Sequence, residues 1–380
     1  MKIGLVCRNF TATRGGLEQD TVILSQALAR RGHDVHILCN RGEQIPGVTI
    51  HHVPIFPFSS PGKNLSFAMT ASRTGSRLGL DILQSMERIW SQDIFRLSDS
   101  INPVQMEARY PNALVRGLKR IGPRRQALTF LERRIFEKGG ARFVLAISKL
   151  VKTQIRNHYQ IPEEKIVVIY NSVDTRKFNP ATTGVFRAEM RERFAVTDKE
   201  PLILFLGNDF KRKGLLLLLE ALASMKKETF TLIVAGSDRP GKYLRFAVKN
   251  GIGSKVRFIG HHPCPEKLYA ASDLFVLPTR DDTFGNVCLE AMACGVPVIA
   301  THTAGASELI DHGMNGYVAN SWDAAELSTW IGTFLHQAGK TAMGANAAEK
   351  AAEFTMDRHM EQVLSLYKRV YEGKTHDCEG

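Results

Sequence analysis

The stretch Pro278-Thr-Arg-Asp-Asp-Thr-Phe-Gly-Asn-Val-Cys-Leu-Glu-Ala-Met-Ala-Cys-Gly-Val-Pro297 decides the fold of the second half of the chain. It begins where the short apolar run 273–278 ends at a proline, which predicts a buried strand that stops at a loop. Gly295 and Pro297 stop a helix, so residues 284–294 are predicted to form about three helical turns. A strand, a loop and a helix in this order form the repeating unit of an α/β fold.

Two carboxylates lie eight positions apart on this loop and helix. Asp282 precedes the predicted helix and Glu290 lies inside it, so a rise of ~1.5 Å per residue separates them by roughly two turns. That separation suits the two ends of one extended ligand. Between them, Gly285, Asn286 and Val287 place backbone N–H groups at the helix N-terminus, where a phosphate can bind. An isolated pair of acids would more often belong to a solvated loop whose charges complement the helix dipole.

The neighbouring residues favour a functional site. The segment from Asp282 to Glu290, followed by Ala-Met-Ala-Cys-Gly-Val-Pro, resembles the Glu-x7-Glu signature of glycosyltransferase family 4. Members of that family are retaining, nucleotide-sugar-dependent enzymes of the GT-B type. The resemblance therefore implies an α/β fold with two Rossmann-like domains facing a cleft. The first acid is Asp282 where the family usually has Glu, and Asp281 would give the wrong spacing.

The resemblance covers essentially the whole chain and predicts its domains. Residues 1–172 are expected to form an N-terminal acceptor-binding domain, and residues 173–355 a C-terminal nucleotide-sugar-binding domain. A C-terminal helix over 356–373 is expected to pack back on the first domain. The 380 residues suit two domains of about 150 to 200 residues each, and the alternation of strand and helix patterns predicts parallel sheets covered by helices.

Further donor-binding residues are assigned to loops that follow strands. The apolar run 201–207 predicts a buried parallel strand, and the loop after it carries Arg212 and Lys213. In the family pattern these cations neutralise the departing diphosphate, and the chain contains no Asp-x-Asp metal motif, so we expect no metal. A lone basic loop would otherwise be solvated surface charge. The other assignments are Gly207 at the strand end, Phe258 and Gly260 beside the nucleobase, Gly285, Asn286 and Val287 at the diphosphate, Glu290 on the ribose hydroxyls and Asp282 on the sugar.

The first strand, residues 2–7, is followed by a turn that contains glycines and then by a helix. The turn lacks Gly-x-Gly-x-x-Gly, which disfavours a dinucleotide cofactor. The resemblance assigns Gly15 and Gly16 to backbone contacts with the donor diphosphate, although such glycines are also typical of a flexible turn. Asp20 is predicted to face an acceptor hydroxyl or to complement the helix dipole.

A second acceptor residue is predicted near position 99. Family members usually carry a His in this neighbourhood, beside the reacting carbon, and this sequence has Asp99 there. Our hypothesis is that Asp99 lines the acceptor site and takes the acceptor proton. A turn residue at the end of a strand is an equal alternative.

The span from Arg109 to Arg142 is strongly basic and predicts an anionic partner. One interpretation is an amphipathic surface that lies on an anionic membrane, where each Lys or Arg contributes about 1 kcal/mol. A solvated charged face over core contacts is the alternative of equal weight. The net charge of +12 and the pI of about 9.5 also suit nucleic acid, but no recognition motif or aromatic stripe supports that partner. The basic residues of this span are Arg109, Arg116, Lys119, Arg120, Arg124, Arg125, Arg133, Arg134, Lys138 and Arg142.

The resemblance implies a retaining hexosyltransferase. It also implies that the reaction moves glucose from UDP-glucose to a membrane-associated glycolipid such as the heptose of the lipopolysaccharide core, with no further cofactor. A nucleotide-sugar epimerase or hydrolase of the same fold is the alternative, and a basic nucleic-acid-binding protein is a distant one. The scattered cysteines, with no signal sequence and no apolar run of 18 residues, predict a cytoplasmic protein. We expect a monomer bound peripherally to the inner face of the cytoplasmic membrane.

Overall fold

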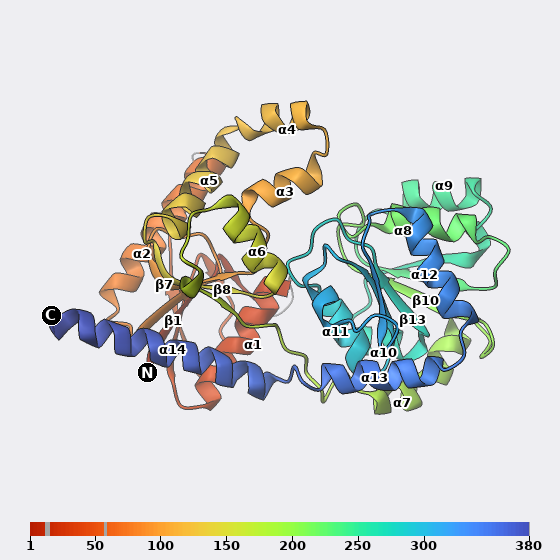
Figure 1. The fold of residues 1–380 in the computed structure, drawn as a ribbon. Coiled ribbons are helices and arrows are strands. Elements are labelled where there is room, and N and C mark those ends of the chain that lie inside the picture. The colour runs from red at the N-terminus through yellow and green to blue at the C-terminus, as the bar shows by residue number, and fades with distance from the viewer. Residues whose placement is uncertain (12–15, 57–58, 380) are drawn as a thin grey trace. The chain divides into compact units, whose positions relative to one another are not determined.

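The computed structural model describes residues 1–11, 16–56 and 59–379 (Figure 1). The chain divides into two compact units. The first contains Met1–Tyr170 together with the chain from Met360 onward, and the second contains Asn171–His359. Each unit is built on its own parallel sheet with its own hydrophobic core, so the two are described in turn.

The sheet of the first unit has the strand order β5-β3-β1-β6-β7-β8-β9, and every pair is parallel. Its central strands are almost completely buried, as is usual for a parallel sheet covered on both faces. The strands are β1 (Lys2–Val6), β3 (Asp34–Cys39), β5 (Val48–His52), β6 (Ile82–Ser85), β7 (Gln92–Leu97), β8 (Ala141–Ala146) and β9 (Ile166–Val168). A separate parallel pair joins β2 (Asn9–Phe10) to β4 (Arg41–Gly42).

The helices of the first unit follow the strands along the chain. They are α1 (Gly16–Arg30), α2 (Ser60–Arg77), α3 (Asn102–Arg109), α4 (Ala113–Arg120), α5 (Pro123–Phe136), α6 (Lys149–His158) and the short 3-10 helix η1 (Glu163–Lys165). Helix α2 packs against α5. Pro123 opens α5, where its missing N–H costs nothing.

The C-terminal helix α14 (Met356–Glu379) returns to the first unit. The buried Tyr367 hydroxyl donates to Gln84 Oε1 at 3.0 Å, and Lys374 Nζ lies 2.6 Å from Asp93 Oδ2. Both partners belong to the strand region of the first unit. The predicted return of the C-terminal helix is confirmed, and the helix extends beyond the predicted end at residue 373.

The second unit has a parallel sheet with the order β12-β11-β10-β13-β14-β15. Helices α8, α9 and α12 pack together, α10 packs against α7, and α11 packs against α13, which gives a helix layer on each face (Figure 1). The strands are β10 (Leu202–Leu206), β11 (Thr231–Ala235), β12 (Val256–Gly260), β13 (Leu274–Leu277), β14 (Val298–Thr301) and β15 (Gly316–Ala319). The helices are α7 (Pro180–Arg193), α8 (Leu215–Ser224), α9 (Gly241–Lys249), α10 (Pro265–Ala271), α11 (Asn286–Ala293), α12 (Ala324–His336) and α13 (Lys340–Ala351), with 3-10 helices η2 (Gly253–Lys255) and η3 (Gly305–Leu309).

The core of the second unit gathers around the leucine-rich helix α8. Leu215, Leu218 and Leu222 are fully buried together with Phe205 and Val234 of the neighbouring strands. Each such side chain contributes about 1.5 to 3 kcal/mol relative to its exposed state. The α/β class with two Rossmann-like units is therefore confirmed.

Helix α11 begins two residues later than predicted. Residues 284–294 were expected to be helical, and the structure has Asn286–Ala293. Gly285 precedes the helix in the left-handed conformation, with φ of 90°, so the helix cannot include Phe284. Consequently Asn286, rather than Phe284, presents the first backbone N–H of the helix.

Candidate active site

The strand order places a switch point in the second unit. Strands β10 and β13 are neighbours at the centre of the sheet. The chain continues from β10 to β11 on one side and from β13 to β14 on the other side, so the two connections run in opposite directions. Ligands of open parallel α/β sheets bind beyond the carboxyl ends of the strands at such a point. The loops at this edge run from Gly207 to Gly214 after β10 and from Pro278 to Gly285 after β13.

Two glycines allow these loops to approach their neighbours closely. A Cβ on Gly214 would lie 1.8 Å from the carbonyl oxygen of Pro278, and the φ of Gly214 is +82°. A Cβ on Gly236 would lie 2.1 Å from the carbonyl oxygen of Gly207. Only glycine fits the first position without movement of the backbone. The loop after β10 is thereby held directly against the end of β13.

This close approach brings Lys213 to Asp282. The Lys213 ammonium contacts Asp282 Oδ2, and Arg212 Nη1 lies 3.9 Å from the same oxygen. Arg212 Nη1 also donates to the Asp281 carbonyl oxygen at 2.8 Å. Three of the four residues assigned to catalysis therefore form one cluster at the switch point.

Asp282 is buried, with 8% of its surface exposed. Burial would raise the pKa of its carboxyl, but Lys213 and Arg212, with hydrogen bonds from Lys213 and from the backbone N–H of Phe284, lower that pKa below its usual value. Its backbone N–H donates to the Thr303 carbonyl at 3.1 Å, and its carbonyl accepts from Gly305 N at 3.0 Å. The cluster thus holds an ionised carboxylate on a well-fixed loop.

Glu290 lies one turn into α11, and its orientation depends on Tyr269 of α10. The Tyr269 hydroxyl lies 2.9 Å from Glu290 Oε2 and 3.2 Å from the Val287 carbonyl oxygen. Tyr269 is fully buried, and burial together with the Glu290 charge holds the pKa of its phenol well above the usual value. Tyr269 is therefore a neutral hydrogen-bond donor to the carboxylate that was predicted to bind ribose.

The beginning of α11 is tied to the segment that opens the second unit. Asn286 Oδ1 accepts from Asn171 Nδ2 at 2.7 Å. Gly285 allows the turn into the helix, since a Cβ there would lie 3.1 Å from Leu277 Cδ2 and 3.7 Å from Asp282 Oδ2. The first backbone N–H groups of α11 therefore lie beside the cluster of Lys213, Arg212 and Asp282.

The residues assigned to the nucleobase lie along the same sheet edge. Phe258 is half-buried on β12, with its ring 6.3 Å from that of Phe210 in the loop after β10. Gly260 ends β12 with a φ of +71°, and its carbonyl oxygen accepts from Gly236 N at 2.8 Å. The structure thus gathers the predicted donor residues of the second unit on the carboxyl edge of β12, β10 and β13.

The predicted residues of the first unit lie at the corresponding edge of its own sheet. Gly15 lies outside the described residues, and Gly16 begins α1. Asp20 Oδ2 lies 3.0 Å from Arg96 Nη2, and Arg96 is 4% exposed. Asp99 is exposed and follows β7 by two residues. Asp20 is therefore a partner of Arg96, a contact that the sequence did not predict.

Several charged residues near Asp99 were not predicted. Arg8 follows β1, and its Nη2 lies 3.7 Å from Glu87 Oε2 beyond β6. Burial raises the pKa of Glu87, and Asp99 adds to that increase against the opposing effect of Arg8 and Arg88. Position in the loop that follows a strand was a usable signal for Arg8, as it was for Arg212 and Lys213.

A buried carboxylate, Glu132, holds Arg88 in place. Glu132 is fully buried and accepts from Arg88 Nε at 2.7 Å, from Asn102 N at 2.9 Å and from the Tyr159 hydroxyl at 2.5 Å. Arg88 Nη2 donates in addition to the Ser100 carbonyl at 3.0 Å. Burial and the Glu132 charge raise the pKa of Tyr159. The network fixes Arg88 beside Asp99, and no local sequence pattern indicates it because its members are far apart in the chain.

Comparison with known proteins identifies the family. The model described as Glycosyltransferase Family 4 matches residues 14–177, and the model described as Glycosyl transferases group 1 matches residues 186–352. The chain belongs to glycosyltransferase family 4. The predicted family and the predicted class of enzyme, a glycosyltransferase, are both confirmed.

Curated relatives span most of this family 4 chain. Lipopolysaccharide glucosyltransferase WaaG of Escherichia coli (strain K12) is 25% identical over 304 residues, which are 78% of this chain and 79% of that protein. The D-inositol 3-phosphate glycosyltransferase of Jonesia denitrificans is 25% identical over 396 residues, 95% of this chain and 92% of that protein. The uncharacterized glycosyltransferase MJ1607 of Methanocaldococcus jannaschii is 28% identical over 235 residues, and the match spans 60% of each protein.

A solved structure shows the same fold. The crystal structure of WaaG, described as a glycosyltransferase involved in lipopolysaccharide biosynthesis, matches with a TM-score of 0.79 at 23% identity. The match covers 97% of this chain and 98% of that one. The GT-B fold of this family 4 glycosyltransferase is thereby established.

Two features are absent from the described residues. No helix in the part of the chain that the structure describes is long and apolar enough to span a membrane. Within the same residues, no group of three or more His, Cys, Asp or Glu side chains is arranged to hold a metal ion.

Proposed function

We propose that this family 4 glycosyltransferase is a retaining hexosyltransferase that moves glucose from UDP-glucose to a membrane-associated glycolipid. The observation that carries the proposal is the cluster of Lys213, Arg212 and Asp282 at the switch point of the second unit. Cations beside the first turn of α11 suit a nucleoside diphosphate, and a buried carboxylate in contact with them suits a sugar hydroxyl.

In the proposed reaction, the bond between the sugar C1 and the β-phosphate oxygen breaks, and its electron pair leaves with UDP. Lys213 and Arg212 stabilise the charge that develops on this leaving group. Asp282 accepts a hydrogen bond from a hydroxyl of the transferred sugar, and Glu290, oriented by Tyr269, holds the ribose hydroxyls. Gly207, Phe258 and Gly260 are assigned to the base side, and Gly15, Gly16, Gly285, Asn286 and Val287 to backbone contacts with the diphosphate.

The acceptor residues are assigned to the first unit. A hydroxyl oxygen of the acceptor forms the new bond to C1 with the original anomeric configuration, and its proton passes to Asp99. Asp20, held by Arg96, is assigned to orient the acceptor. The acceptor that we propose first is the heptose of a lipopolysaccharide core, because lipopolysaccharide glucosyltransferase is what the name of the WaaG relative states.

The basic span from Arg109 to Arg142 supports a lipid-bound acceptor and a peripheral position on the cytoplasmic membrane. Helix α4 buries none of its residues, and Leu114 and Leu118 are 81% and 73% exposed. A helix with lysine and arginine beside such exposed leucines suits an anionic membrane surface. A solvated charged face would not need leucines as exposed as these.

A second acceptor class follows from the other relatives. The D-inositol 3-phosphate glycosyltransferase of Jonesia denitrificans matches over 95% of this chain, so a small phosphorylated polyol is the competing acceptor. The exposed apolar face of α4 favours the lipid, because a small acceptor in water gives that face no role. An epimerase or hydrolase would release UDP with no acceptor present.

The test is release of nucleoside diphosphate from UDP-, GDP- and ADP-sugars by the full-length protein. Each donor is supplied alone, with a deglycosylated lipopolysaccharide core, or with inositol 3-phosphate, and the anomeric configuration of the product is read by NMR. We expect release from UDP-glucose only with the core acceptor, and an α product. Release that needs inositol 3-phosphate would refute the lipid acceptor, and release without any acceptor would refute transfer.

A further inference from the structure

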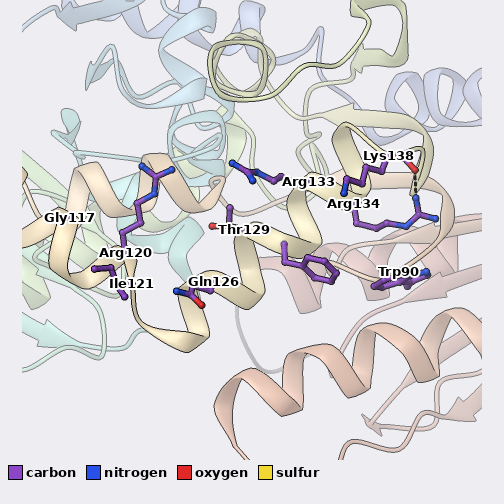
Figure 2. Close-up of a pocket in the computed structure, with 10 residues that line it drawn as sticks. Trp90, Gly117, Arg120, Ile121, Gln126, Thr129, Arg133, Arg134 and Lys138 are labelled. Atoms are coloured by element: carbon purple, nitrogen blue, oxygen red, sulfur yellow. Dashed lines mark hydrogen bonds between the residues drawn. The ribbon is translucent and has the colours of Figure 1, made fainter.

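A pocket of about 740 Å³ opens in the first unit over α4 and α5 (Figure 2). Its lining comes from α4, from α5, from Lys138 just after α5 and from Trp90 just before β7. The volume lies within the range of about 300 to 1,000 Å³ that is usual for small-molecule sites. None of the residues assigned above to the donor or the acceptor hydroxyl lines it.

Four cations line the pocket. Arg120, Arg133, Arg134 and Lys138 line it, and within the described residues none of the four forms an ion pair. Figure 2 shows Arg120 extending from α4 and Arg133 from α5 on the same side of the turn between these helices. Cations that line the same pocket repel each other, and an anion that binds there is stabilised by all of them.

Arg134 is held in place and keeps one buried donor unused. Its Nη1 donates to the Lys138 carbonyl oxygen, shown by the dashed line in Figure 2, and its guanidinium lies 5.4 Å from the centre of the Trp90 ring. Its Nε is buried and has no hydrogen-bond partner. A buried N–H without a partner is unfavourable, so an acceptor that reached this atom would be stabilised.

The other wall of the pocket is aromatic. Trp90 and Phe130 both line it, with ring centres 5.8 Å apart and with 37% and 49% of their surfaces exposed. Large exposed aromatic side chains at a hollow are typical of a binding surface. The C–H face of a pyranose ring is apolar and fits such a wall, while the phosphate on the same sugar would reach the cations.

We infer that this pocket binds the phosphorylated sugar headgroup of a membrane glycolipid. Arginine is suited to phosphate because its guanidinium donates two parallel hydrogen bonds. The neighbouring Leu114 and Leu118, both strongly exposed on α4, would lie beside the lipid chains. The inference rests on the proposed function, because it makes this headgroup part of the acceptor or of its close lipid neighbours.

Binding of a headgroup in this pocket differs from general attraction of a basic surface to anionic lipid. A diffuse basic face responds to the charge density of the membrane and to little else. A pocket with an aromatic wall and fixed arginines should in addition distinguish a phosphorylated sugar from a simple phosphodiester headgroup of the same charge.

The test uses two matched pairs of substitutions in the full-length protein. Arg120→Gln with Arg133→Gln removes one pocket cation from α4 and one from α5. Lys119→Gln with Arg124→Gln removes one exposed cation from each of the same helices, outside the pocket. Trp90→Leu is the third variant, because it changes the aromatic wall and leaves the charge unaltered.

Binding is measured by flotation with phosphatidylcholine vesicles that contain either phosphatidylglycerol or a phosphorylated diglucosamine lipid at equal surface charge. We expect the unaltered protein to bind the phosphorylated glycolipid vesicles about tenfold more tightly, as one charge-assisted hydrogen bond would give. The pocket pair and Trp90→Leu should lose that preference. The pair Lys119→Gln with Arg124→Gln should weaken binding to both kinds of vesicle by one common factor and keep the preference.

Equal binding of the unaltered protein to both kinds of vesicle would overturn the inference. Identical behaviour of the two charge pairs would also overturn it, because the basic face would then act only through its total charge. No donor is present in this assay, so it is independent of turnover. A failure of UDP-sugar transfer would refute the proposed function and leave these binding results standing.

Discussion

Replacement of Lys213 by alanine should damage both the stability of the second unit and its chemistry. Asp282 is 8% exposed, and Lys213 is in direct contact with its carboxylate. Removal of one partner from a buried ion pair costs about 3 to 5 kcal/mol. We expect the lower end, about 3 kcal/mol, because Arg212 Nη1 remains 3.9 Å from the carboxylate oxygen. In a unit of this size that loss lowers Tm by about 6 to 12 °C.

The same substitution should lower turnover. In the proposed reaction the Lys213 ammonium stabilises the departing diphosphate, and loss of one such group costs about 100- to 1,000-fold in kcat. Lys211→Ala is the matched control, since Lys211 lies in the same loop and is exposed. Calorimetry and steady-state release of UDP measure the two effects separately.

A second substitution separates stability from catalysis. Adding Asp282→Asn to Lys213→Ala removes the unpaired buried charge and should restore part of the lost Tm, while kcat stays low. Normal kcat in a folded Lys213→Ala variant would refute the assigned role of the lysine. If the loss of stability in the double variant equals the sum of the losses in the two single variants, Lys213 and Asp282 do not form a coupled buried pair.

Three further outcomes follow from the same site. Tyr269→Phe should raise the donor KM by about tenfold with little change in kcat, because the lost hydrogen bond orients Glu290, which we propose to bind the donor ribose; donor titration checks this. The pKa of Asp282 is lowered on folding. Its contribution to stability is therefore fully present above the unfolded pKa of about 4 and is lost as the pH falls toward the lower folded pKa. The difference in Tm between the unaltered protein and Asp282→Asn should be constant near neutrality and shrink below about pH 4. Gly214→Ala should prevent normal folding, since its Cβ would lie 1.8 Å from the Pro278 oxygen, whereas Gly313→Ala at the same φ of +82°, with nothing within 4 Å, should cost only about 1 kcal/mol in chemical denaturation.

Much of the fold could be predicted because buried parallel strands are short apolar runs. The runs that became β10 and β13 are visible in the sequence, and the cations and acids that follow them are placed at the sheet edge by topology alone. The start of α11 was predicted two residues too early, because the sequence around Gly285 does not show that this residue adopts a left-handed conformation, with φ of 90°, before the helix begins.

The contacts that orient the site could not be predicted in this way. Tyr269 lies in an apolar helix like an ordinary core residue, and only the packing of α10 against the site brings its hydroxyl to Glu290. Asp20 and Arg96 are 76 residues apart, so their ion pair depends on where β7 lies beside α1. Tertiary packing, which no local pattern records, determines these partners.

The central claim is transfer of a hexose from a nucleoside diphosphate sugar, and release of UDP from UDP-glucose tests it most directly. We predict that release by the full-length protein requires a deglycosylated lipopolysaccharide core and falls about 100-fold or more with Lys213→Ala. Release at the same rate without acceptor, or no release from UDP-, GDP- or ADP-sugars with any acceptor, would contradict it.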